Sequence, residues 1–70
     1  MSWTQSVYSS NVSSVGWNSD TEEIEVTWQN GKVSAYSGGS EEMAHQCANA
    51  ASVGQFVNSE FKPSLGHRYV

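Results

Sequence analysis

Hydrophobic and polar residues alternate strictly over residues 23–28, in the stretch EIEVTW. Every second residue is apolar and two of these are β-branched, which is the period-two pattern of a half-buried strand. Asn30 and Gly31 follow closely, and both residue types tolerate the positive φ of a type I′ hairpin turn. The pattern therefore predicts a hairpin in which 23–28 pairs with a return strand over 32–37.

The apolar spacing becomes helical after the Gly-Gly pair at 38–39. Small apolar residues recur at every third or fourth position over 41–51, and Ser40 is a favourable N-cap residue ahead of two glutamates. A second apolar stripe indicates a helix over 53–61, which Pro63 ends. The second half of the chain is therefore predicted to be helical.

Residues 12–18 contain scattered apolar residues and are predicted as a further strand. Together these elements predict an α+β domain in which helices cover one face of an antiparallel sheet. In chain order they are a three-stranded meander over 12–18, 23–28 and 32–37 and two helices over 41–51 and 53–61. Residues 12–70 are predicted as a single domain, preceded by an N-terminal arm over 1–11 that is either loose or held along an edge. The tail GHRYV is either a short closing strand or an extended end.

Composition narrows the class of function. The 70 residues carry seven acids and three bases, with a formal net charge of −4, so a broad basic surface for DNA is not expected. No apolar run approaches the ~20 residues that span a bilayer, and no membrane partner is expected. A single cysteine excludes an intramolecular disulfide and suits a reducing compartment, which predicts a cytoplasmic protein.

The small size of the chain favours self-association. A chain this short buries a modest core, and domains of this size often recruit a disulfide, a metal or a second subunit. His45, His67 and Cys47 are too few and too scattered for a closed zinc site, so no metal or cofactor is predicted. His45 and Cys47 lie two apart on a helix and face different ways, so no nucleophile–base pair and no enzymatic activity are predicted. A homo-oligomer is the expected assembly.

Three stretches of the chain together resemble a known family. They are SSNVSSVGW, NGKVSAYSG and NAASVGQFVNSEFKPSLGHRYV, which span nearly the whole chain. They resemble the KTSC domain, a small domain found at the C-terminus of some lysyl-tRNA synthetases and as stand-alone bacterial and phage proteins. The positions that match its most specific motif are Asn49, Ala50, Ser52, Gly54, Phe56, Val57 and Asn58, followed by Lys62 and Arg68 in the tail. The resemblance implies an RNA-binding role. However, the family's Tyr-x-Tyr motif is here Ser34-Ala35-Tyr36, and the tail is less basic than is usual in the family.

Two alternatives remain open for Ser52-Val53-Gly54-Gln55. In the first, Ser52 is the N-cap of the second helix and Gln55 its reciprocal partner, which makes a capping box. In the second, the free amides at this helix start bind an anion, and Gly54 allows a phosphate to approach the backbone. Lys62 or Arg68 would then complete the site. The first alternative is favoured, although one chain can use both.

The remaining candidates are a ring, two amides and a cationic tail. Trp28 aligns with the apolar face of its strand and is predicted to pack in the core. Tyr36 shares its strand face with polar neighbours, so stacking on a ligand or partner is weighed equally with packing under the helices. Asn49 and Asn58 flank the junction between the helices and either cap a helix end or contact a ligand. Lys62 and Arg68, beside His67, either bind a carboxylate or phosphate or form a solvated tail.

The sequence thus predicts a non-catalytic, oligomeric binding protein. The preferred ligand is a phosphate-bearing small molecule such as a nucleotide signal, and a phage-encoded member would sequester that signal in the host cytoplasm. One alternative is a protein-interaction module that inhibits a host protein or joins a larger assembly, and another is an RNA-binding domain. The predicted ligand-binding residues are Tyr36, Asn49, Ser52, Gly54, Asn58, Lys62 and Arg68.

Overall fold

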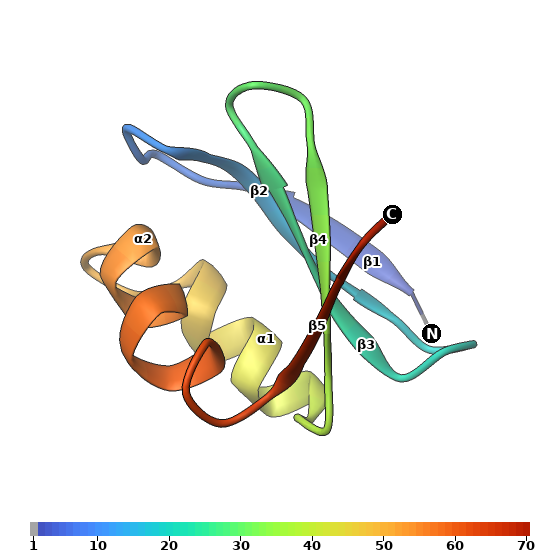
Figure 1. The fold of residues 1–70 in the computed structure, drawn as a ribbon. Coiled ribbons are helices and arrows are strands. Elements are labelled where there is room, and N and C mark those ends of the chain that lie inside the picture. The colour runs from blue at the N-terminus through green and yellow to red at the C-terminus, as the bar shows by residue number, and fades with distance from the viewer. Residues whose placement is uncertain (1) are drawn as a thin grey trace.

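Five antiparallel strands form one sheet in the computed structural model, which describes residues 2–70 (Figure 1). The strands lie in the order of the sequence, so that each pairs with the next along the chain. They are β1 (Trp3–Ser6), β2 (Val12–Asn18), β3 (Glu23–Trp28), β4 (Val33–Ser37) and β5 (Gly66–Tyr69). The α+β class is confirmed, with a larger sheet than the sequence predicted.

Two helices cover one face of this sheet (Figure 1). The first is α1 (Glu41–Ala48), in which the Ser40 hydroxyl accepts a hydrogen bond from the amide of Met43, as expected of an N-cap. The second begins as α2 (Val53–Phe56) and continues without interruption as η1 (Val57–Phe61). The amide of Lys62 donates to the carbonyl of Val57 at 3.0 Å, which is the wider i→i+5 pairing of a π-helix.

The predicted three-stranded sheet is incomplete because both outer segments, which the sequence left open between a paired and an unpaired state, form strands. β1 pairs with β2 within the segment predicted as an N-terminal arm, and β5 closes the other edge beside β4. Each has only four residues, too few for a readable alternation. These strands form because a neighbouring strand offers unpaired backbone groups, and a local pattern does not record that.

Trp3 anchors β1 to the first helix. Its indole Nε1 donates to Glu41 Oε2 at 2.8 Å, and its ring stacks on His45 with the centroids 4.2 Å apart. Gly16 of β2 lies opposite this strand, and a Cβ there would stand 2.6 Å from the carbonyl oxygen of Trp3. The missing side chain of Gly16 therefore allows β1 to lie close to β2.

The hairpin between β3 and β4 is confirmed, but its predicted type I′ turn is wrong. Gly31 has a φ of +88°, whereas Asn30 is not among the residues with positive φ. The Asn30 side chain instead accepts a hydrogen bond from the amide of Lys32. One left-handed glycine after right-handed residues is the other common hairpin connection, in which a bulge absorbs the extra residue.

The first helix is shorter than predicted and ends at Ala48. Asn49 is its C-cap, and both its backbone amide and its side-chain Nδ2 donate to the carbonyl of His45. The backbone bond is the i→i−4 bond of an α-helix, and the side-chain bond gives the same carbonyl a second donor. Asn49 thus fills the helix-capping role that was one of its two predicted alternatives.

The core lies between the helices and the covered face of the sheet. Two rows of paired residues cross that face: Trp17, Ile24, Tyr36 and His67 form one, and Val15, Val26, Ser34 and Tyr69 the other. Helical side chains, chiefly Ala44, Cys47, Val57 and Phe61, are buried against them. Because His67 and Tyr69 continue these rows beyond the core, β5 carries two rings along the edge of the helix-covered face.

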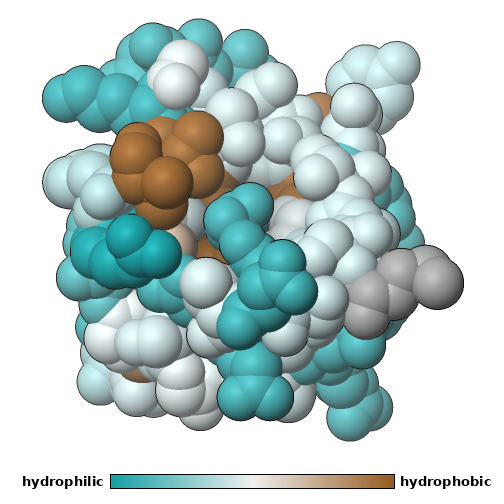
Figure 2. Space-filling model, turned by 90° about the vertical axis from the view of Figure 1, so that its right-hand side faces the viewer, coloured by the Kyte–Doolittle hydropathy of each residue, from teal (hydrophilic) through white to brown (hydrophobic). Residues whose placement is uncertain are grey.

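The opposite face of the sheet is open and mainly hydrophilic. Figure 2 shows this side of the molecule, with pale and teal surface around one compact hydrophobic patch. Ala35 lies in the middle of this face between Glu25 and Arg68, and it is nevertheless completely buried by the side chains around it. No helix among residues 2–70 is long and apolar enough to cross a membrane.

Candidate functional site

One cavity lies where the β1–β2 turn, the β3–β4 turn, the second helix and the end of β5 approach one another. Its volume is about 440 Å³, and it opens to solvent. It is lined by Ser10, Asn11, Trp28, Gln29, Asn30, Lys32, Gly54, Asn58, Lys62 and Tyr69. Four separate segments of the chain contribute, so this cavity exists only in the folded protein.

A second cavity of about 380 Å³ adjoins the first. Its lining consists of Trp28, Ser34, Tyr36, Lys62, His67 and Tyr69. Trp28, Lys62 and Tyr69 line both cavities. We call the two cavities together the cleft.

The cleft gathers positive charge on an acidic protein. Lys32 and Lys62 both line it, whereas no Asp or Glu belongs to the lining of either cavity. Lys32 Nζ also lies over the Tyr69 ring, 5.9 Å from its centroid, within the range of a cation–π contact. A concave surface with two ammonium groups and no carboxylate favours an anionic ligand.

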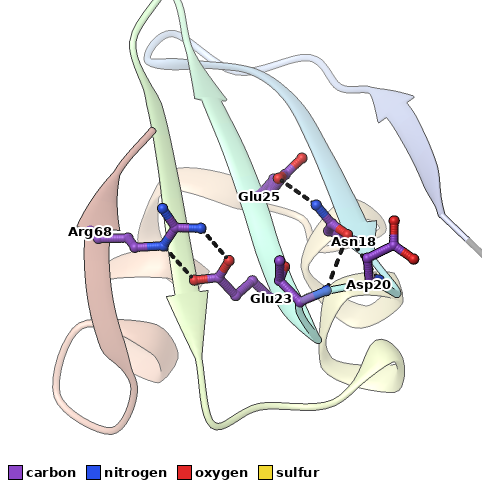
Figure 3. Close-up of polar contacts among 6 residues, drawn as sticks. Asn18, Asp20, Glu23, Glu25 and Arg68 are labelled. Carbon is purple, nitrogen blue, oxygen red and sulfur yellow. Dashed lines mark hydrogen bonds and ion pairs between the residues drawn. The ribbon is translucent and has the colours of Figure 1, made fainter.

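Arg68, the third basic residue, lies on the other face of the sheet. It separates His67 from Tyr69 in β5, and alternate residues of a strand point to opposite faces. Its guanidinium reaches across β4 to Glu23 on β3, as Figure 3 shows. The two hydrogen bonds measure 2.9 Å from Nε and 2.8 Å from Nη2. Arg68 is thereby held away from the cleft.

This ion pair sets the charge state of Glu23. The hydrogen bonds from Arg68 hold the pKa of the Glu23 carboxyl below its usual value, although burial opposes them. Neighbouring polar groups continue on the open face, where Asn18 Nδ2 donates to Glu25 and Asn18 Oδ1 accepts from the amide of Asp20 (Figure 3). We assign this cluster to the structure of the sheet.

Four of the seven predicted ligand-binding residues line the cleft. Gly54 and Asn58 line the larger cavity, Tyr36 the smaller one, and Lys62 both. Asn49, Ser52 and Arg68 line neither. Ser52 is the N-cap of α2 by position, but its side chain makes no capping hydrogen bond, so the predicted capping box is absent.

Tyr36 is a core residue that also borders the smaller cavity. Only 1 % of its surface is exposed, and its ring packs against Phe61 and His67 with centroids 5.3 and 4.9 Å away. Burial raises the pKa of its phenol. Its strand face, polar in sequence, is the helix-covered face, because Tyr36 pairs with Ile24. Packing is thus the observed role of this ring.

The comparisons with known proteins bear on the whole chain. The family model of the KTSC domain matches residues 8–65. The chain belongs to the KTSC family. The fold of this KTSC protein resembles the crystal structure of a KTSC domain protein from Yersinia pestis, with a TM-score of 0.85 and 24% sequence identity over 100% of this chain and 99% of that one. Comparison with curated proteins found no match.

Several residues that line the cleft of this KTSC domain were not predicted. They are Ser10, Asn11, Trp28, Gln29, Asn30, Lys32, Ser34 and Tyr69. His67, which also lines the cleft, was named only as a neighbour in the candidate cationic cluster. Trp28 packs against the core as predicted, but it stays partly exposed at the cleft, and its indole donates to Ser34 Oγ at 2.8 Å. The alternation that places Trp28 on the covered face was visible, but the place where the helices stop covering that face was not.

The remaining reactive groups of the KTSC domain lie outside the cleft. Cys47 is completely buried, and burial raises the pKa of its thiol to about 12. The thiol is therefore protonated at neutral pH and a poor nucleophile. Residues 2–70 contain no group of three or more His, Cys, Asp or Glu side chains arranged to hold a metal ion.

Proposed function

We propose that this KTSC domain is a non-catalytic binding protein whose cleft takes a phosphate-bearing small molecule, such as a nucleotide signal. The observation that carries the proposal is that Lys32 and Lys62 both line a cleft without carboxylates, on a chain whose net charge is −4. Two ammonium groups supply charge-assisted hydrogen bonds to phosphate oxygens.

Aromatic and amide groups beside these lysines support a nucleotide over a simple anion. Trp28 and Tyr69 border both cavities, and Tyr69 is two-thirds exposed at 67 %. Exposed rings offer a stacking surface for a base. Asn58 and Gln29 place carboxamides in the same cavity, and a carboxamide can both donate to and accept from the edge of a base.

The experiment compares two variants that each lose one positive charge. Lys62→Gln removes a lysine from the cleft, and Arg68→Gln removes the base on the opposite face. Binding of adenosine monophosphate is measured by isothermal titration calorimetry. We expect Lys62→Gln to weaken binding by about tenfold to a hundredfold, since a charge-assisted hydrogen bond contributes about 1.5–3 kcal/mol.

Arg68→Gln is the matched control and should leave the affinity unchanged once thermal unfolding confirms that it is folded. Equal weakening by both variants would mean that net charge alone drives binding, and would contradict the proposed site. If the unmodified protein binds no nucleotide, the proposal fails. The alternative of a protein-interaction module then takes its place.

A further inference from the structure

We propose that the cleft is built for a dinucleotide, with one base in each cavity and the phosphate between them at Lys62. This inference rests on the proposed function and names the ligand class of the same cleft. It starts from the division of the cleft, since two cavities of about 440 and 380 Å³ share Lys62, Trp28 and Tyr69 as lining residues. Each volume lies at the lower end of the roughly 300–1,000 Å³ of a ligand pocket.

The larger cavity carries the groups that distinguish one base from another. Four carboxamides line it: Asn11, Gln29, Asn30 and Asn58. Gln29 is fixed in place, because its Nε2 donates to the carbonyls of Ser9 and Val12 at 3.3 and 3.2 Å. A fixed Gln with its Oε1 as acceptor, opposite Asn58 from the second helix, suits the polar edge of a base.

The smaller cavity offers rings with fewer polar groups. Tyr36 is buried behind His67, whose ring centroid lies 4.9 Å away, so the exposed rings of this cavity are His67 and Tyr69. These two rings meet edge to face, with centroids 4.7 Å apart. The hydroxyl of Ser34 is already engaged by the Trp28 indole. The face of one such exposed ring holds a base by stacking, whatever the hydrogen-bonding edge of that base.

Lys62 lines both cavities, so the linkage of a two-base ligand that fills both would lie within reach of this residue. A mononucleotide fills one side and leaves the exposed rings of the smaller cavity in water. A dinucleotide engages both sides through a single phosphate contact, and it gains the second stacking interaction with little further loss of translational freedom. The cleft should therefore favour two joined nucleotides over one.

The test compares adenosine monophosphate with two dinucleotides, linear pApA and cyclic di-adenosine monophosphate, by isothermal titration calorimetry. We expect at least one dinucleotide to bind about tenfold or more tightly than the mononucleotide. Comparing the linear with the cyclic probe shows which linkage the cleft takes. A third probe is the tetranucleotide pApApApA. If affinity keeps rising with the length of the probe, the ligand is single-stranded RNA and the inference is overturned.

Two variants assign the bases to the two cavities. His67 lines the smaller cavity and not the larger one, so His67→Ala should weaken dinucleotide binding much more than mononucleotide binding. Asn58→Ala alters only the larger cavity and should weaken both ligands. Circular dichroism checks that both variants are folded. If mononucleotide and dinucleotide bind equally, or if His67→Ala affects neither, the dinucleotide inference is wrong while the proposed function stands; if no probe binds, both fail.

Discussion

Arg68 shows at the scale of a single residue how strand alternation separates neighbours in sequence. His67 and Tyr69 border the cleft, whereas the residue between them pairs with Glu23 on the open face (Figure 3). The Glu23 side chain is only 8% exposed, and that of Arg68 is 57% exposed. The charge that matters for this pair is thus the carboxylate, because it has lost most of its contact with water.

The ion pair makes a prediction about acid stability. Because the pKa of Glu23 is lowered in the folded state, the pair stabilises the fold above the ordinary glutamate value of about 4.3. That contribution is lost as the pH falls through the lowered folded-state pKa. Arg68→Gln should therefore reduce the free energy of unfolding clearly at about pH 6.5 and much less at about pH 3, as measured by urea unfolding.

A glutamate without such a partner provides the comparison for this effect. Glu60 is exposed on η1, and Glu60→Gln should leave the difference in stability between the two pH values nearly unchanged. If the difference in the free energy of unfolding between Arg68→Gln and the unmodified protein stays constant with pH, Arg68 acts through packing.

At the scale of the elements, two glycines have opposite roles. Gly16 lies where β1 and β2 meet, and an added Cβ would come within 2.6 Å of the backbone oxygen of Trp3. Gly54 lies in α2, where an added Cβ would find only the Ser9 hydroxyl, 4.0 Å away. The first glycine is needed for close strand contact, and the second costs helix stability without a steric reason.

Alanine substitutions at these two positions should therefore change stability in opposite directions. Gly16→Ala should destabilise the fold by about 1–3 kcal/mol, since backbone must shift to accommodate the methyl group. Gly54→Ala should stabilise it by about 0.5–1 kcal/mol. Urea unfolding measures both, and hydrogen exchange should show the loss of protection in Gly16→Ala to be greatest in β1. Equal effects of the two variants would contradict this account of the β1–β2 contact.

At the scale of the whole molecule, the prediction of self-association keeps a physical basis. The sheet ends in two strands, β1 and β5, that pair on one side only. Edge strands present unpaired backbone groups to another chain, and a core this small gains from a second subunit. We expect sedimentation velocity to detect a homo-oligomer whose share rises with protein concentration. A monomer at every concentration tested would rule this out.

Much of the fold could be predicted because its signals are local. The strand at 23–28, the following hairpin and the start of the first helix at Ser40 each depend on residues that are close together in the sequence. The end of that helix was misplaced because Ala51 continues the apolar spacing beyond the C-cap residue Asn49. The candidate site could be predicted only in part, since Gly54, Asn58 and Lys62 belong to one family motif, whereas Trp28 and Tyr69 come from distant strands.

The α+β class, the three central strands, the family and the acidity of this protein follow from the amino-acid sequence, because alternation, turn residues and charge depend on neighbouring positions. The completion of the sheet by β1 and β5 follows from the three-dimensional fold, since their pairing depends on backbone groups far away in the chain. The three-dimensional fold also determines which basic residues share the cleft. Lys32 and Lys62 meet there because a strand turn and a helix approach each other, whereas alternation along β5 turns Arg68 to the opposite face.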